Sequence, residues 1–230
     1  MSDLYVPEVV PDADREFYES QRRYGNRVGW GDQPAVLIVD MTLAFTEETD
    51  DGEACIAATE RLLDAARETD VPVYYTTPTP AGSGPEGYPV TTKASPASSR
   101  GPERGGESRP AWLDKLDRIA PELEPREDEQ VIRKERASAF FDTHLSNMLR
   151  YEGCDTLVVA GMTTSGCIRS TVVDSHSSNF RTIVPQECVA DPSQISHEVG
   201  LFDMDVKYAD VTPLSDVIEK LRSYADTSSV

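Results

Sequence analysis

The stretch TLVVAGMTTSGCIRSTVVDS, residues 156–175, has the pattern of a strand, a turn and a helix. A run of β-forming residues ends at Gly161, small residues follow, and Cys167 stands at the head of a helix-like segment. A cysteine that serves only to fill a core is expected inside the apolar run, not after the turn. The position of this thiol therefore calls for a functional explanation.

The rest of the chain repeats the strand-and-helix pattern. Several of its β-type runs are almost continuously apolar, which is typical of strands buried on both faces of a parallel sheet. The six runs are residues 35–40, 71–77, 129–134, 156–161, 181–186 and 208–213. Helical patterns separate most of them, at residues 52–69, 143–151, 165–178, 195–206 and 214–224. This alternation predicts an α/β fold: a three-layer, doubly wound, Rossmann-like sandwich with a mainly parallel six-stranded sheet.

The domain boundaries follow from the same pattern. We expect an N-terminal arm over residues 1–30, one domain over 31–224 and a tail over 225–230. Residues 78–110 interrupt the domain with a stretch rich in Pro, Gly and Ser, too long for an idle connection. A disordered insertion and an ordered lid or subunit contact both remain open for this loop.

Composition narrows the class of protein. The 230 residues carry 41 acidic and 22 basic side chains, a formal net charge of −19, which disfavours nucleic acid and anionic membranes as partners. Only five of the basic residues are lysine, and this acidic, lysine-poor surface favours a salt-rich cytosol over an ordinary acidic cytoplasmic enzyme. No run approaches the roughly 20 apolar residues of a membrane span, and the polar N-terminus is unlike a signal peptide. We therefore expect a cytoplasmic protein.

Three reactive side chains follow three of the predicted strands. Asp40 ends the first, Lys134 ends the third, and the turn after the fourth leads to Cys167. Ligands of open parallel sheets bind at the carboxyl ends of the strands, so these residues map to one edge. Singly, Asp40 is also explained as a helix cap, Lys134 as a solvated charge and Cys167 as a core residue. Their coincidence favours a site.

The chemistry of a nucleophilic thiol requires such a set. A thiol with its ordinary pKa of roughly 8.5 is mostly protonated at neutral pH, and a helix N-terminus or a nearby ammonium favours the thiolate. A carboxylate within reach can accept the thiol proton and return it to a leaving amine. Backbone N–H groups of the turn can face a developing oxyanion, and Ser165 and Gly166 are small enough to let a substrate approach.

The motifs AVLIVDM, VIRKERASAFFDTHL and GMTTSGCIRSTVVDS resemble those of the isochorismatase-like cysteine hydrolases. The resemblance runs from about Tyr24 to about Leu221. RYGNRVGWGDQPAVLIVD and SHEVGLFDMDVKYADV are most similar to the branch of N-carbamoylsarcosine amidase and maleamate amidase. The resemblance implies the isochorismatase-like hydrolase fold and a homo-oligomer, a tetramer or a dimer. It implies an amidohydrolase that cleaves a small linear amide or ureido compound through a thioester and releases ammonia, without metal or cofactor.

The resemblance also assigns residues. It implies a catalytic triad of Cys167, Asp40 and Lys134, a non-proline cis peptide between Met162 and Thr163, and an oxyanion hole formed by the N–H groups of Thr163 and Cys167.

Three departures from the family narrow the activity. Isochorismatases proper lack the nucleophilic cysteine, so Cys167 argues against that activity. Nicotinamidases carry an Asp/His metal site near the second strand, whereas no histidine precedes His144 here. The carbamoylsarcosine branch carries an arginine after the Asp of DAVGDR, and the matching ECVADPS has Pro192 there. This puts the carboxylate-binding arginine, and N-carbamoylsarcosine as substrate, in doubt.

Two other classes remain as alternatives: a catalytically silent small-molecule-binding protein and a thiol-redox protein. The four cysteines are scattered without a C-x-x-C pair, which disfavours a disulfide framework, a zinc site and a redox pair. Candidates for lining the substrate pocket are Phe45, Tyr88, Trp112, Phe141 and Thr164, each equally explained as core or surface.

Overall fold

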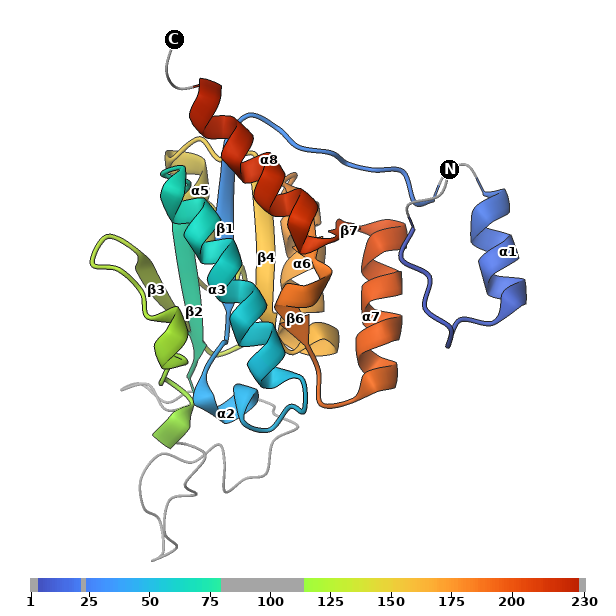
Figure 1. Ribbon diagram of the computed structural model, residues 1–230, viewed down its shortest axis with the longest axis horizontal. Helices are drawn as coiled ribbons and strands as arrows, with labels where there is room; N and C mark the ends of the chain where they lie inside the picture. Colours follow the sequence, from blue (N-terminus) through green and yellow to red (C-terminus); the bar gives the residue numbers. More distant parts are fainter. Residues whose placement is uncertain (1–3, 22–23, 80–113, 228–230) are drawn as a thin grey trace, which may run out of the picture.

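The computed structural model describes residues 4–21, 24–79 and 114–227, and within them a parallel sheet lies between layers of helices (Figure 1). The sheet order is β3-β2-β1-β4-β5-β7, and the short β6 pairs with β4 beside this path. The strands are β1 (Pro34–Val39), β2 (Val73–Pro78), β3 (Gln130–Lys134), β4 (Thr156–Met162), β5 (Arg181–Pro185), β6 (Val189–Ala190) and β7 (Asp210–Thr212). Every pairing between these strands is parallel.

The α/β fold with a parallel sheet confirms the prediction, and all six expected strands are present. The strand count needs a correction, because the sheet has seven strands and not six. The additional strand, β6, is two residues long, too short to leave a periodic pattern in the sequence.

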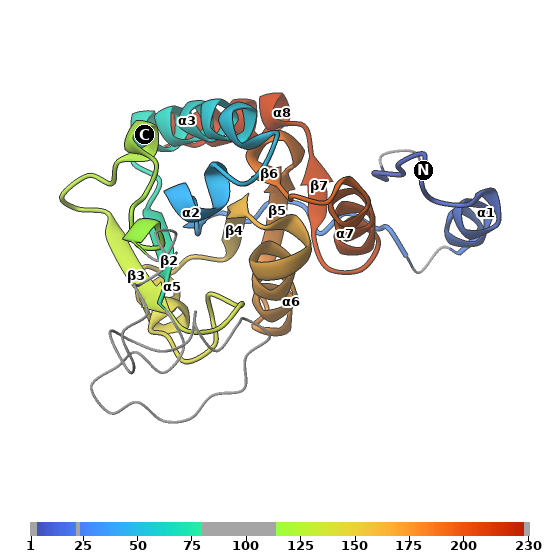
Figure 2. The ribbon, with the colours of Figure 1, turned by 90° about the horizontal axis from the view of Figure 1, so that it is seen from below.

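The central strand β1 explains the two helical layers. Its six residues are all buried, and successive side chains point to opposite faces of the sheet. Val36 and Ile38 pack in one core with α3 and α8, whereas Leu37 and Val39 pack in a second core with α5, α6 and α7. Figure 2 shows α3 and α8 on one side of the sheet and α5 and α6 on the other.

The helices follow the predicted segments closely. They are α3 (Gly52–Glu68), α5 (Leu145–Tyr151), α6 (Arg169–Ser177), α7 (Gln194–Lys207) and α8 (Leu214–Thr227). The predicted helix over 165–178 covers most of η3 (Thr164–Ile168) as well as α6. The sequence analysis did not predict α1 (Asp12–Ser20), the four-residue α2 (Leu43–Thr46), or the short turns η2 (Pro121–Leu123) and η4 (Gln186–Cys188).

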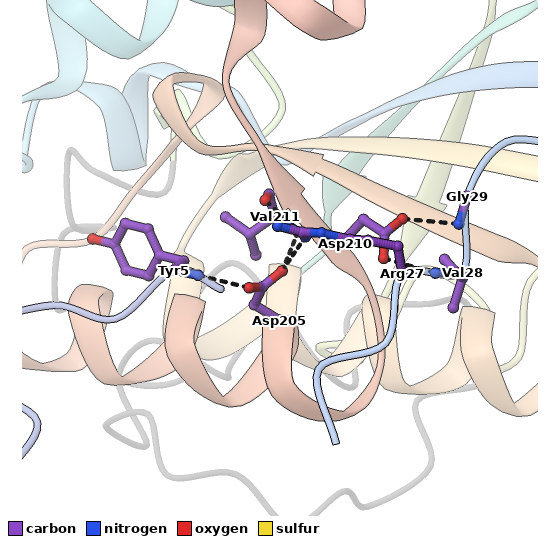
Figure 3. Close-up of polar contacts among 7 residues, drawn as sticks. All are labelled: Tyr5, Arg27, Val28, Gly29, Asp205, Asp210 and Val211. Atoms are coloured by element: carbon purple, nitrogen blue, oxygen red, sulfur yellow. Dashed lines mark hydrogen bonds and ion pairs between the residues drawn. The ribbon is translucent and has the colours of Figure 1, made fainter. Parts of the chain in front are cut away.

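The N-terminal arm lies against α7 and β7. Tyr18 of α1 packs edge-to-face on Phe202 of α7, with ring centroids 5.4 Å apart. Two buried carboxylates hold the extended part of the arm (Figure 3). Asp205 accepts the Tyr5 N–H at 2.7 Å and pairs with Arg27 at 2.7 Å, and Asp210 accepts the N–H groups of Val28 and Gly29, both at 2.9 Å.

The predicted domain boundaries stay predictions. Within the predicted loop 78–110, residues 80–110 lie outside the described residues. Helix α8 continues to Thr227, so it enters the predicted tail of residues 225–230. Among the helices of the described ranges, none is long and apolar enough to cross a membrane.

Candidate active site

The carboxyl ends of β1, β3 and β4 bring together Asp40, Lys134 and Cys167. Asp40 directly follows β1, Lys134 is the last residue of β3, and Cys167 lies in η3 after β4. Because these strands are parallel and belong to one sheet, their ends reach the same edge. Asp40 is fully buried and Lys134 is 3% exposed, whereas Cys167 is partly exposed.

The backbone at the end of β1 turns Asp40 into the site. Asp40 has a φ of +51°, a left-handed conformation that aspartate adopts more readily than most residues. Its N–H still bonds to the carbonyl of Thr76 on β2 at 3.1 Å. The Thr76 hydroxyl donates to Asp40 Oδ1 at 2.8 Å, which fixes the orientation of the carboxylate.

Lys134 links the other two members. Its Nζ lies 2.6 Å from Asp40 Oδ2, 3.0 Å from the carbonyls of Arg136 and Ala137, and 3.4 Å from Cys167 Sγ. An ammonium has three protons to donate, which bond to the two carbonyls and the sulfur, while the Asp40 carboxylate is its ion-pair partner. This arrangement holds Lys134 in its charged form, with the sulfur as its longest contact.

Cys167 is carried by a tight turn between β4 and α6. The peptide bond between Met162 and Thr163 is cis. The Thr163 carbonyl accepts the N–H groups of Gly166 and Ile168 at 3.0 and 3.1 Å, on either side of Cys167 in the chain. A Cβ on Gly166 would lie only 2.7 Å from Thr163 Oγ1, so a larger residue there would displace Thr163. The oxyanion hole of Thr163 and Cys167 N–H groups stays a prediction.

The electrostatics of the site differ from the expectation of an ionised thiol. Burial first, and the Asp40 carboxylate second, raise the pKa of Cys167 to about 12, and Lys134 acts in the expected direction without outweighing them. Burial also raises the pKa of Asp40, against the lowering effect of Lys134. For Lys134, burial would lower the pKa, but Asp40 and Cys167 raise it above the ordinary value.

These shifts indicate where the thiol proton can go. With Asp40 ionised, Lys134 charged and Cys167 protonated, the three groups have no net charge. Loss of the proton to solvent would leave a net negative charge in a buried place, which is costly. Transfer to Asp40 keeps the site neutral and leaves a thiolate beside Lys134. The Asp40 carboxylate is close enough to Cys167 to raise the pKa of its thiol, so we expect direct transfer between the two groups.

The predicted pocket residues are dispersed. Phe45 lies in α2, partly buried against Leu116, and the Phe141 side chain is 60% exposed. Thr164 is fully buried, with its hydroxyl 2.8 Å from His197 Nδ1. Tyr88 and Trp112 lie outside the described residues. The roles of all five in substrate binding stay predictions.

Sequence analysis missed the polar residues that surround the triad: Thr76, Asp191 and His197. Thr76 could have been predicted, because the parallel pairing of the first two strands places it opposite Val39, the residue before Asp40. Asp191 follows the unpredicted β6, and it accepts the N–H and O–H of Ser165. His197 lies in the first turn of α7, and its contact with Thr164 depends on how that helix packs.

Among the described residues, no group of three or more His, Cys, Asp or Glu side chains is arranged to hold a metal ion. All four cysteines are free thiols, and Cys55, Cys154 and Cys188 are buried. The site itself brings together a thiol, a carboxylate and an ammonium.

Comparison with known proteins gives a family for this arrangement. The sequence pattern of the isochorismatase domain family matches residues 34–216, from β1 to the start of α8. The chain is 35% identical to a maleamate amidohydrolase of Pseudomonas putida, an alignment that covers 94% of this chain and 100% of the relative. It is 33% identical to an N-carbamoylsarcosine amidase of Arthrobacter, over 94% of this chain and 81% of the relative.

A solved structure supports the same fold. An isochorismatase family protein from Burkholderia thailandensis superposes with a TM-score of 0.70, at 21% sequence identity, over 85% of this chain and 99% of that one. At this identity the likeness concerns the fold.

Proposed function

This chain belongs to the isochorismatase family of hydrolases, and we propose that it is a cysteine-dependent amidohydrolase. Its substrate is a small linear amide or an N-carbamoyl compound, from which it releases ammonia. The observation that carries the proposal is the contact of one buried lysine with both a buried carboxylate, at 2.6 Å, and a partly exposed thiol, at 3.4 Å.

The first half-reaction forms the covalent intermediate. Asp40 accepts the Cys167 proton, and the sulfur attacks the carbonyl carbon of the amide. The N–H groups of Thr163 and Cys167 stabilise the oxyanion of the tetrahedral intermediate. Asp40 then returns the proton to the departing nitrogen, so ammonia leaves and a thioester remains on Cys167.

The second half-reaction regenerates the enzyme. Asp40, again ionised, takes a proton from water, and the hydroxide attacks the thioester carbon. The thiolate leaves and regains its proton from Asp40 while the carboxylic acid departs. Lys134 remains charged throughout, so it orients Asp40 and stabilises each anionic sulfur. In sum, an amide and water give an acid and ammonia.

The choice of substrate class rests on the relatives. The two curated relatives carry the names maleamate amidohydrolase and N-carbamoylsarcosine amidase, and both names denote hydrolysis of a small linear compound at a C–N bond. Pro192 at the place of the branch's arginine argues that the carboxylate end of the substrate, if it has one, is bound by another residue.

The test is ammonia release from a panel of small linear amides and ureido acids, with maleamate and N-carbamoylsarcosine among them. We expect release from at least one member with wild-type protein and none with Cys167→Ala. A panel without release in folded wild-type protein, at low and high salt, would overturn the proposal and favour the silent binding alternative.

A further inference from the structure

Two side chains outside the triad contact the turn that carries Cys167. Asp191 bonds to Ser165 and His197 bonds to Thr164, the two residues that open η3. We infer that Asp191 and His197 are positioning residues, which hold these two residues and through them set the orientation of the Cys167 thiol. The inference deepens the proposed function and rests on it.

Strand pairing brings Asp191 to the turn. In the parallel β4–β6 pair, Gly161 is opposite Val189 and Met162 is opposite Ala190. The next residues along, Thr163 and Asp191, therefore leave the sheet side by side at the edge where the triad lies. The short β6 thus has a function in the fold that its length does not suggest, since it delivers a carboxylate to the nucleophile turn.

Both oxygens of the Asp191 carboxylate accept hydrogen bonds, from η3 and from the start of α7. Its Oδ2 accepts both the N–H of Ser165 at 2.9 Å and the Ser165 hydroxyl at 2.7 Å. Its Oδ1 accepts the N–H of Ser193 at 3.1 Å, and Ser193 is the residue that caps α7. One carboxylate therefore ties the nucleophile turn to the start of α7. Hydrogen bonds to an ionised acceptor are stronger than neutral ones.

His197 makes the second connection, one turn into the same helix. Its Nδ1 lies 2.8 Å from the hydroxyl of Thr164, which is fully buried. Burial lowers the pKa of His197, although the carboxylates of Asp191, Asp51 and Glu198 act in the opposite direction. The ring is therefore neutral at pH 7, and a neutral ring can pair with a hydroxyl as donor or as acceptor. Helix α7 packs directly on this residue, since a Cβ on Gly200 would be in ordinary van der Waals contact with Thr164 Cγ2, at 3.5 Å.

Positioning matters because the thiol must meet three groups at once. Cys167 contacts Lys134 on β3, interacts electrostatically with Asp40 after β1, and must also reach the substrate carbon. A displacement of a reacting group by about 1 Å can cost about 100-fold in rate. The turn's own bonds to the Thr163 carbonyl fix its internal shape, whereas Asp191 and His197 fix the turn relative to the helical layer.

The experiment uses isosteric pairs in the full chain. His197→Asn retains a polar group near the position of Nδ1, while His197→Leu has the same shape without it. Asp191→Asn replaces one of the two acceptor oxygens by a donor, whichever way the amide is turned. Ile195→Ala is the matched control, because Ile195 lies in the same helical turn with its side chain 60% exposed. The readouts are kcat and KM for the amide found by ammonia release, the rate of Cys167 alkylation by iodoacetamide, and the melting temperature.

We expect His197→Leu and Asp191→Asn to lower kcat by about tenfold or more, with KM changed by less than about threefold, because the thiol is misplaced while binding persists. His197→Asn should recover most of the loss, and Ile195→Ala should match wild type. Equal kcat in His197→Asn, His197→Leu and wild type would overturn the inference for His197, and an unchanged Asp191→Asn would overturn it for Asp191. A loss of kcat fully matched by a fall in the folded fraction would also overturn it.

Alkylation separates this inference from the proposed function. If wild-type protein releases no ammonia, the function fails, yet the alkylation rate of Cys167 still reports whether the turn is held. A rate changed at least about fivefold in His197→Leu and restored in His197→Asn would support positioning on its own. Identical rates in the three proteins would contradict it.

Discussion

In the proposed mechanism, activation of Cys167 depends on a proton acceptor inside the site, because burial and the Asp40 carboxylate oppose ionisation of the thiol into solvent. Asp40 is suited to accept, since burial raises its pKa and Lys134 stays charged beside it. At this scale the residue types and the strand ends were predictable from the sequence. The dominance of burial over the Lys134 ammonium was not, because it depends on how fully the neighbouring segments cover the site.

The pH dependence of alkylation follows from the sign of this shift. An ordinary thiol has a pKa of about 8.5, whereas that of Cys167 is raised to about 12. The rate of its alkylation by iodoacetamide should therefore keep rising well above pH 8.5. Lys134 lowers this pKa, so Lys134→Met should react more slowly than wild type at a fixed alkaline pH. Peptide mapping by mass spectrometry identifies the modified cysteine. A plateau near pH 9 would be inconsistent with the raised pKa, and equal rates in both proteins would remove Lys134 as the partner of the thiolate.

Substitution of Asp40 tests its role as the proton carrier. Asp40→Asn keeps the shape and the acceptor for Thr76, but a neutral amide cannot take the thiol proton. We expect kcat to fall by about 100-fold to 10,000-fold, the range of general acid–base catalysis, with substrate binding retained. Steady-state kinetics and calorimetric binding measure the two effects. Turnover within a factor of a few of wild type would assign proton transfer to another group.

Some elements of the fold could be predicted from the sequence and others could not. β1 and β4 are long, apolar and buried throughout, so their hydrophobic runs predict strands. β6 is two residues long, and α1 lies in an arm that packs beside α7 rather than in the central cores. The amphipathic pattern of α1 was present in the sequence and was overlooked, whereas a two-residue strand is too short to show a periodicity. The contacts of Asp191 and His197 were hidden for the same reason, because they depend on β6 and on the packing of α7.

The edge strand β3, which carries Lys134, is held at its other end by an ion pair. Arg67 of α3 contacts both oxygens of Glu129 at 2.8 Å, just before β3 begins. Burial alone would raise the pKa of Glu129, but the Arg67 hydrogen bonds lower it below the ordinary value. A depressed carboxyl pKa stabilises the fold above the unfolded value of about 4.3, and this contribution is lost as the pH falls through the folded value.

Glu129→Gln should therefore lower the free energy of unfolding at pH 7 by about 1 kcal/mol, a figure that allows for partial solvent screening. The difference from wild type should shrink as the pH falls below about 4, where the native carboxylate is protonated too. Urea denaturation at the two pH values measures it. Glu68→Gln is the control, because its pair with Arg222 is exposed on both sides and should contribute little. An equal effect of the two substitutions would contradict a special role for Glu129.

For the whole molecule, the formal net charge of −19 follows directly from the sequence. The negatively charged side chains repel one another, and salt shortens the range of that repulsion from about 10 Å at 0.1 M to about 3 Å at 1 M. We expect the melting temperature to rise with KCl from about 0.1 M to about 1 M, because screening relieves the folded state more than the expanded one. Differential scanning calorimetry follows the transition. A constant or falling melting temperature would contradict adaptation to a salt-rich cytosol.

The central claim is that Cys167 attacks an amide. The kcat/KM of Cys167→Ala, compared with wild type on the amide that releases ammonia, tests it most directly. We predict that the variant folds, since the thiol is partly exposed, and that it loses turnover by about 1,000-fold or more because the nucleophile is absent. Hydrolysis by Cys167→Ala within about tenfold of wild type would contradict the covalent mechanism.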